Sequence, residues 1–180
     1  MNIHKGSDRT AYVGERYTVK VARSNPVLFL QEANGIRDAH GLRNLLKVWN
    51  IVSVDSHGGL KYMLLHGVMA NRRERRIAKE FGSVIVPTLS VLGLVNIQPS
   101  VPTTTLTHME AHTAFCETLG PTVTKLGHML EDTSNLGVHD GQVKFVDGGS
   151  VSLEGLMHSQ AEDIEQALGA LTLKLETPTQ

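Results

Sequence analysis

The chain has 180 residues, of which 41% are hydrophobic and 19% charged, a balance typical of folded globular proteins and not of disordered ones. The formal net charge of −1 provides no global field to attract a polyanion, and the 4% of aromatic residues leaves little material for stacking on nucleic-acid bases. The single cysteine excludes an internal disulfide, and no apolar run is long enough for a leader or a membrane span, so a cytoplasmic location is expected.

The N-terminal part of the chain predicts strands followed by a helix. Residues 11–14 and 16–22 read as a hairpin, in which alternation places Lys20 on the face opposite to the neighbouring valines. Ser24 and Asn25 then offer helix caps and Pro26 a first helical position, which predicts a helix over residues 26–39. A further helical turn or two is expected over residues 42–49.

The middle of the chain predicts a second hairpin and a charged helix. Residues 51–55 and 60–68 flank the turn sequence SHGG and predict two paired strands. The stretch NRRERRIAKEFG predicts a short helix that begins at the cap Asn71 and ends at Gly82. Residues 83–105 contain three prolines and give no clear assignment.

The C-terminal part predicts helices around one tight hairpin. Residues 106–130 are expected to be helical, with a kink or break at Gly120 and Pro121. The sequence LGV, the turn HDG and the sequence VKFVD then predict a hairpin. Residues 153–175 read as one amphipathic helix.

Four polar residues stand at informative places in this order. They are a lysine on a strand (Lys20), a glutamate on the following helix (Glu32), and the Asn135 and Asp147 that frame the last hairpin. Phosphoryl transfer from ATP needs a lysine on the phosphates, a glutamate to fix it, and Asn and Asp side chains to hold magnesium. A tight hairpin between Asn135 and Asp147 would aim both into one cleft.

These motifs resemble the protein kinase and aminoglycoside phosphotransferase-like superfamily. TVKVA is similar to the family's lysine-bearing strand, and HMLEDTSNLGVHDGQVKFVDGG to its catalytic loop, hairpin and magnesium motif. The resemblance covers roughly residues 6–150 in the order of elements and is specific from His128 to Gly149. It implies an α+β, two-lobed kinase-like fold, with an antiparallel-sheet N-lobe carrying one helix over residues 1–70 and a reduced, mainly helical C-lobe over residues 71–180.

The resemblance also implies cofactors and residue roles. ATP would be bound by Lys20, Glu32 and Met69, the last on a strand over residues 62–70 that runs into the hinge between the lobes. Magnesium would be held by Asn135 and Asp147. The expected partner is a protein or small-molecule acceptor, with neither nucleic acid nor a membrane.

The chain departs from the family pattern at the general base. The family has an Asp five residues before the metal-binding Asn, and this position is Leu130. A shifted loop would present Asp132 or Glu131 as the base instead. No G-x-G-x-x-G loop precedes Lys20, Gly148 stands where the family has Phe, and only residues 150–180 follow.

Two hypotheses therefore remain open. One is a magnesium-dependent phosphotransferase. The other is a catalytically inactive kinase-like interaction protein, such as a phage inhibitor or modulator of a host enzyme. Small kinase-like proteins of this kind are expected from phage or mobile-element genomes, which would place the chain in the cytoplasm of a bacterial host.

Other polar clusters have simpler interpretations. Lys20 and Glu32 taken singly would be solvated, and Asn135 a turn former. Glu74 and Glu80 interleave with a basic cluster over residues 72–79, formed by Arg72, Arg73, Arg75, Arg76 and Lys79, which predicts a solvated, salt-bridged helix, with nucleic-acid binding as the weaker alternative. His108 and His112 lie one helical turn apart but have no evident third ligand, so no zinc site is expected. Cys116 is expected to be a buried apolar residue.

Overall fold

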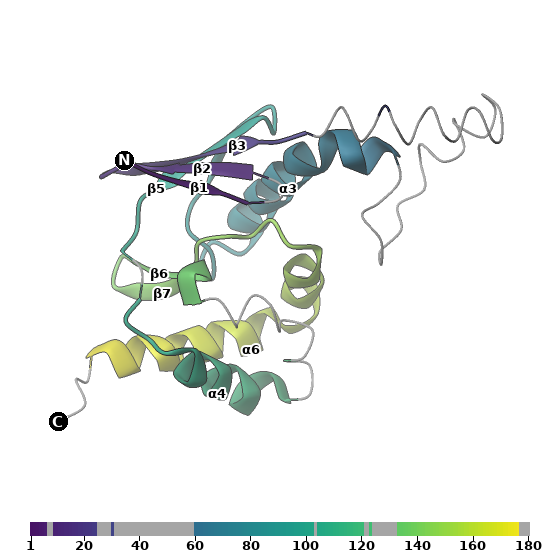
Figure 1. The fold of residues 1–180 in the computed structure, drawn as a ribbon. Helices are drawn as coiled ribbons and strands as arrows, with labels where there is room; N and C mark the ends of the chain where they lie inside the picture. Colours follow the sequence, from purple (N-terminus) through teal and green to yellow (C-terminus); the bar gives the residue numbers. More distant parts are fainter. Residues whose placement is uncertain are drawn as a thin grey trace.

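The computed structural model describes residues 1–6, 9–24, 30, 60–102, 104–120, 123 and 133–176. This part of the chain is α+β, with a five-stranded antiparallel sheet, a separate two-stranded hairpin and three helices (Figure 1). The sheet lies at one end of the molecule, and the helices α4 (His108–Leu119) and α6 (Val151–Glu176) lie at the other. Between them lies the hairpin of β6 (Leu136–His139) and β7 (Gln142–Phe145) (Figure 1). The helix expected over residues 26–39, the turns over 42–49 and the strand over 51–55 lie outside the described residues.

The strands of the sheet come from two parts of the chain, one before and one after the long helix α3 (Leu60–Glu80). Its strands are β1 (Asn2–Lys5), β2 (Arg9–Val13), β3 (Tyr17–Ala22), β4 (Leu89–Val91) and β5 (Val95–Pro99), in the order β1-β2-β3-β5-β4. The predicted hairpin of β2 and β3 is confirmed. Since β4 and β5 follow α3 in the chain, the expected division at residue 70 falls inside a helix, and sheet strands come from both sides of it.

One face of the sheet is polar and buried. Thr18 and Lys20 on β3 and Asn96 and Gln98 on β5 are each less than 8% exposed, and the register pairs Lys20 with Asn96. Val19 lies on the opposite, half-buried face. Lys20 therefore does point away from the valines, as the alternation predicted, and it points into the protein.

Helix α3 (Leu60–Glu80) corrects three expectations. Residues 60–68 are not a strand; a short, largely apolar run fits either a strand or a helix, and no proline separates this run from the strong helix formers after it. Asn71 lies inside the helix and not at its cap, where its Nδ2 donates to Gly93 O at 3.0 Å. Met69 lies on α3 too, so the expected strand leading into a hinge is wrong.

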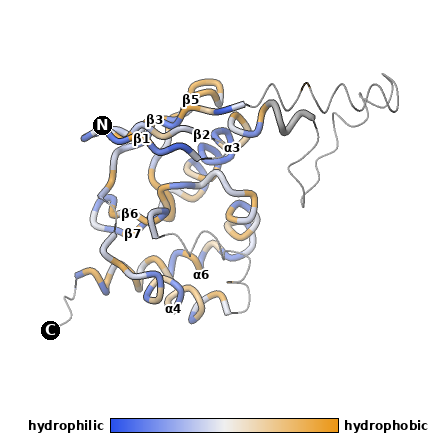
Figure 2. The backbone as a smooth tube through the Cα atoms, in the orientation of Figure 1, coloured by the Kyte–Doolittle hydropathy of each residue, from blue (hydrophilic) through white to orange (hydrophobic). Residues whose placement is uncertain are grey.

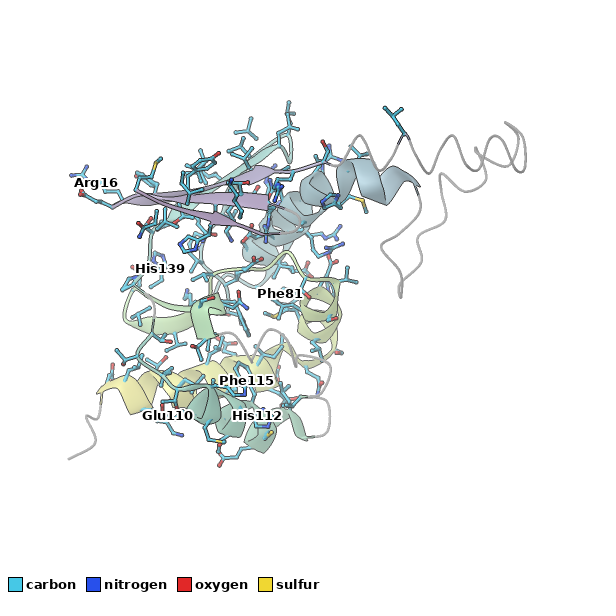
Figure 3. The ribbon with its side chains drawn as sticks, in the orientation of Figure 1. Arg16, Phe81, Glu110, His112, Phe115 and His139 are labelled. Atoms are coloured by element: carbon cyan, nitrogen blue, oxygen red, sulfur yellow. The ribbon has the colours of Figure 1, made fainter. Side chains whose placement is uncertain are left out.

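The hydrophobic core lies among the hairpin, α4 and α6. Phe145 on β7 is completely buried, and its ring lies 5.9 Å from that of Phe115 on α4, which Figure 3 places between α4 and α6. Phe145 also exchanges backbone hydrogen bonds with Val84 and Val86, at 2.9 and 3.0 Å. The segment that follows α3 is thereby joined to the hairpin.

The hairpin and the helix break expected at Gly120 agree with the sequence, whereas the last helix is not the single helix expected. Strands β6 (Leu136–His139) and β7 (Gln142–Phe145) pair around Asp140 and Gly141, whose positive φ values of 52° and 75° suit a tight hairpin turn. Helix α4 (His108–Leu119) begins with a capping box of Thr107 and Glu110. Helix α6 (Val151–Glu176) consists of two helices joined at a kink at Gln160, whose φ of −145° and ψ of 37° are not helical. The expectation of one helix over residues 153–175 is therefore wrong.

Hydrophobic residues recur along α4 and α6, which pack together at the end of the molecule opposite the sheet (Figure 2). This periodicity is what an amphipathic helix needs in order to cover a core on one side. Within the described residues, none of the helices has the length and apolar character needed to cross a bilayer.

Candidate functional site

Lys20 is held in a buried network between the sheet and α3. Its Nζ donates to Glu74 Oε1 through a short contact and to Val146 O at 2.5 Å, and its side chain is 7% exposed. The ammonium group can donate three hydrogen bonds, so among the described residues one remains beyond these two. Lys20 thus joins the sheet to both α3 and the segment after β7.

Glu74 is the carboxylate at the centre of this network, and the prediction that it is solvated is wrong. Its side chain is completely buried and also accepts from Arg9 Nη1 at 2.6 Å, Asn96 Nδ2 at 2.8 Å and Gly148 N at 3.4 Å. A buried carboxylate requires this degree of pairing to remain charged.

Glu74 was not expected in the site, although a signal for it was present in the sequence. Ala70, Glu74 and Ile77 follow the spacing of one helix face, and all three are buried. An acidic residue in the middle of an apolar stripe is more informative than one that alternates with arginines. The surrounding arginines obscured this stripe.

Arg9, the first residue of β2, was also missed. Besides Glu74, its guanidinium contacts Asn71 Oδ1 at 3.4 Å and the Asp147 carboxylate. Burial would lower the pKa of Arg9, but the charges of Glu74 and Asp147 outweigh burial and raise that pKa above its ordinary value. No sequence pattern singled out this arginine, since it is one charged residue at the start of a short strand.

Asp147 follows β7 and faces Arg9. Its Oδ1 accepts from Arg9 Nη2 and from the backbone N–H of Gly149 at 2.9 Å. Burial would raise the pKa of Asp147, but the charges of Lys20 and Arg9 and the bond from Gly149 outweigh it and hold that pKa well below its usual range. The Asp147 side chain is still 42% exposed, so a ligand in solution can approach it.

Both glycines after Asp147 have packing reasons. A Cβ on Gly148 would collide with the Ile85 side chain, and a Cβ on Gly149 would lie 2.5 Å from Arg9 Nη2. The D-G-G motif therefore lets the chain pass close to α3 and to the Arg9 guanidinium. This close approach brings Asp147 into the network.

The residues predicted from sequence are brought together in part. Lys20 and Asp147 belong to one charge cluster. Asn135 lies close to Asp147 along the hairpin: the backbone carbonyl of Asn135 accepts a hydrogen bond from the N–H of Val146, the residue before Asp147, at 2.8 Å. Glu32, Glu131 and Asp132 lie outside the described residues. Within the described chain, Glu74 is the carboxylate that contacts Lys20.

The donors present fit magnesium in kind. Mg²⁺ is usually bound by one or two carboxylates together with substrate phosphates and water, and Asp147 is an ionised, partly exposed carboxylate. The described residues contain no group of three or more acidic, His or Cys side chains able to hold a metal by themselves. The buried oxygens Asn96 Oδ1 and Gln98 Oε1 lack a hydrogen-bond partner in the described structure, so this face has unused acceptors.

The alternative clusters are less well assembled. His108 and His112 lie on α4 with rings 5.8 Å apart, and His112 Nε2 is 3.4 Å from the partly buried Cys116 Sγ; Figure 3 labels His112 on this helix. Arg73 and Arg76 pair with Glu154 of α6. The exposed basic face of α3 lines a shallow hollow with the β4–β5 turn, formed by Arg72, Arg75, Arg76, Lys79, Ser90, Leu92 and Gly93.

Comparison of the chain with protein-family models, with curated proteins and with solved structures finds no match in any of the three.

Proposed function

We propose that the chain is a kinase-like phosphotransferase that binds ATP with magnesium and passes the γ-phosphate to a protein or small-molecule acceptor. The observation that carries the proposal is the ion pair between strand Lys20 and helix Glu74 beside Asp147. The antiparallel sheet at one end and the helix-rich core at the other support a two-lobed kinase-like arrangement. The resemblance over residues 128–149 supplies the reaction class.

The proposed roles follow from the contacts. Lys20 has one ammonium donor left for a phosphate oxygen, while Glu74 fixes its position, as the sequence analysis expected of Glu32. Asp147 and Asn135 would hold magnesium, which neutralises charge on the phosphates when bound. Asp132 or Glu131 would accept the proton of the attacking hydroxyl.

Nucleotide binding is measured first, by the melting temperature with ATP in magnesium and in EDTA. A ligand at one hundred times its Kd stabilises a protein by about 2.7 kcal/mol, which raises the Tm of a chain of this size by about 5–10 °C. We expect that rise for ATP with magnesium. No rise in either condition would refute the proposed site.

Phosphoryl transfer is measured next, with γ-labelled ATP and candidate acceptors. Asp147→Asn and Lys20→Met should each reduce label transfer about a hundredfold or more, since each removes a charge from the reacting phosphates. Glu165→Gln, an exposed position on α6, is the matched control and should keep full transfer. Transfer that survives both site variants would show that another site is responsible.

A second candidate is the catalytically inactive interaction protein, and two observations favour it. Arg9 already neutralises Asp147, while the sequence has Leu130 at the usual base position. This candidate predicts no ATP-dependent rise in Tm. It also predicts a stoichiometric host protein partner that is retained by the Asp147→Asn variant.

A further inference from the structure

Arg9 occupies an unusual position for a long charged side chain. It begins β2, yet its side chain is only 9% exposed, whereas arginines are rarely buried without partners. Its backbone carbonyl accepts from Gly6 N at 2.9 Å. The strand therefore directs the guanidinium inward, under the sheet.

The two ends of the guanidinium are held differently. Nη1 contacts Glu74 at 2.6 Å and Asn71 at 3.4 Å, and both of these side chains are completely buried on α3. Nη2 contacts Asp147, whose side chain is 42% exposed. The helix therefore anchors Arg9, and Asp147 is the partner that solvent ligands can reach.

The network is already balanced in charge. Arg9 and Lys20 supply two positive charges, and Glu74 and Asp147 supply two negative ones. A divalent cation at Asp147 would add two positive charges next to the Arg9 guanidinium. Like charges at such short range repel each other, and the Arg9 side chain is itself only 9% exposed.

The chain also makes room for this arrangement. A Cβ on residue 149 would lie 2.5 Å from Arg9 Nη2 and 2.9 Å from Cζ, so glycine there leaves the space that the guanidinium fills. The same Gly149 donates its N–H to Asp147 Oδ1. The two groups that donate to Asp147 Oδ1, the Arg9 guanidinium and the Gly149 N–H, are therefore packed against each other.

We infer that Arg9 is the resident cation of Asp147, so that the guanidinium and a divalent metal ion exclude each other at this carboxylate. Metal binds Asp147 only when Arg9 is withdrawn or removed. The inference rests on the proposed function in one respect, which is that Asp147 is the carboxylate a metal would use. It assigns to Arg9 the control of the metal dependence of the site.

The test measures Mn²⁺ binding to the full chain without nucleotide, by electron paramagnetic resonance of the free ion. Mn²⁺ serves as a probe because it takes the same oxygen ligands as Mg²⁺. Arg9→Met removes the charge and keeps the aliphatic stem, and it should bind Mn²⁺ at least about tenfold more tightly than the wild type. Arg9→Met combined with Asp147→Asn should lose this gain.

Arg16→Met is the matched control, since Arg16 is exposed in the turn before β3 (Figure 3), and it should bind Mn²⁺ as the wild type does. Arg9→Lys keeps a positive charge for Glu74, but an ammonium group cannot bridge two carboxylates as the planar guanidinium does. This variant should show a smaller gain in Mn²⁺ affinity, and it replaces Arg9→Met in the test if Arg9→Met does not fold. An unchanged affinity in the Arg9 variants, or a gain that persists with Asp147→Asn, overturns the inference. Tight wild-type binding that Asp147→Asn abolishes overturns it without any Arg9 variant.

ATP binding in EDTA, measured on the same samples, separates this inference from the proposed function. If Arg9→Met gains Mn²⁺ while no variant binds ATP in any condition, the phosphotransferase proposal fails and the role of Arg9 stands. If ATP and magnesium bind the wild type and the Arg9 variants show no gain in Mn²⁺ affinity, the inference about Arg9 fails and the phosphotransferase proposal stands.

Discussion

At the scale of single residues, Glu74 is the group on which the charge network depends most. It pairs with both Lys20 and Arg9 while completely buried. Breaking a buried ion pair from one side leaves the other charge uncompensated, which is far more costly than losing a surface pair. The stability of the sheet against α3 should therefore depend on this one carboxylate.

We expect Glu74→Gln to lower the free energy of unfolding by about 3–5 kcal/mol, because Arg9 and Lys20 would then share only Asp147. Glu80→Gln, on an exposed part of the same helix, should change it by less than about 0.5 kcal/mol. Urea denaturation of the two variants measures both values. Equal values for the pair would contradict the central role of Glu74.

The dependence of the free energy of unfolding on acid pH tests the charge interactions of Asp147. Its pKa is lower in the folded protein than in the unfolded chain, where an aspartate titrates near about 3.9. The unfolded state therefore binds a proton first as the pH falls, so the stabilisation by Asp147 is complete above about pH 5 and is lost progressively below about pH 4.

Asp147→Asn should remove this part of the pH dependence. Free energies of unfolding measured between about pH 3 and pH 7 should fall less steeply below about pH 4 in the variant than in the wild type. Parallel curves would mean that Asp147 does not carry the expected charge interactions.

At the scale of elements, the link between β7 and α6 brings the charges together. The two glycines of this link pass against Ile85 and Arg9 with no space for a Cβ. The link is therefore constrained by packing on the sheet side. Within α6, in contrast, a Cβ added at Gly155 or Gly169 would have no atom within 4 Å.

Gly149→Ala should lower the free energy of unfolding by about 1–3 kcal/mol, because its methyl group displaces the Arg9 guanidinium. Gly155→Ala is the matched control. It lies exposed in α6 with no atom near its Cβ position, and the better helix propensity of alanine should stabilise the protein by about 0.5–1 kcal/mol. Thermal or urea unfolding distinguishes the two opposite signs, and destabilisation of both would contradict the packing argument.

At the scale of the whole molecule, the hairpin β6–β7 connects the sheet-bearing half with the helical core. Phe145 packs on Phe115 of α4 and pairs by backbone with the segment after α3. One buried ring therefore lies between α4 and the chain that returns to the sheet.

Phe145→Ala should lower the free energy of unfolding by about 3–5 kcal/mol, since it leaves a cavity in a completely buried position. Tyr17→Ala, at a site 60% exposed on β3, should cost less than about 1 kcal/mol. Denaturation followed by circular dichroism should still give one transition for both. Two separate transitions for Phe145→Ala would show that the halves fold independently.

Several elements could be predicted because their signals are local. The Asp-Gly turn demands positive φ and thus a tight hairpin, and alternation along β3 decides which face Lys20 occupies. The apolar period over residues 153–175 is helical by itself. The mixed region over residues 83–105 and the apolar run at 60–68 lacked such a signal, because short apolar runs fit both strand and helix.

The sequence alone determined the α+β composition, the last hairpin and the face of β3 that Lys20 occupies, since each depends on neighbours within a few positions of the chain. That this face is buried was decided by the tertiary structure. Only the tertiary structure decided that Glu74 is the partner of Lys20 and that Arg9 contacts Asp147. These residues are brought together by strand order and by the close passage of Gly148 and Gly149. Pairing between charges so distant in the chain depends on how whole elements pack, and no local pattern of residues records it.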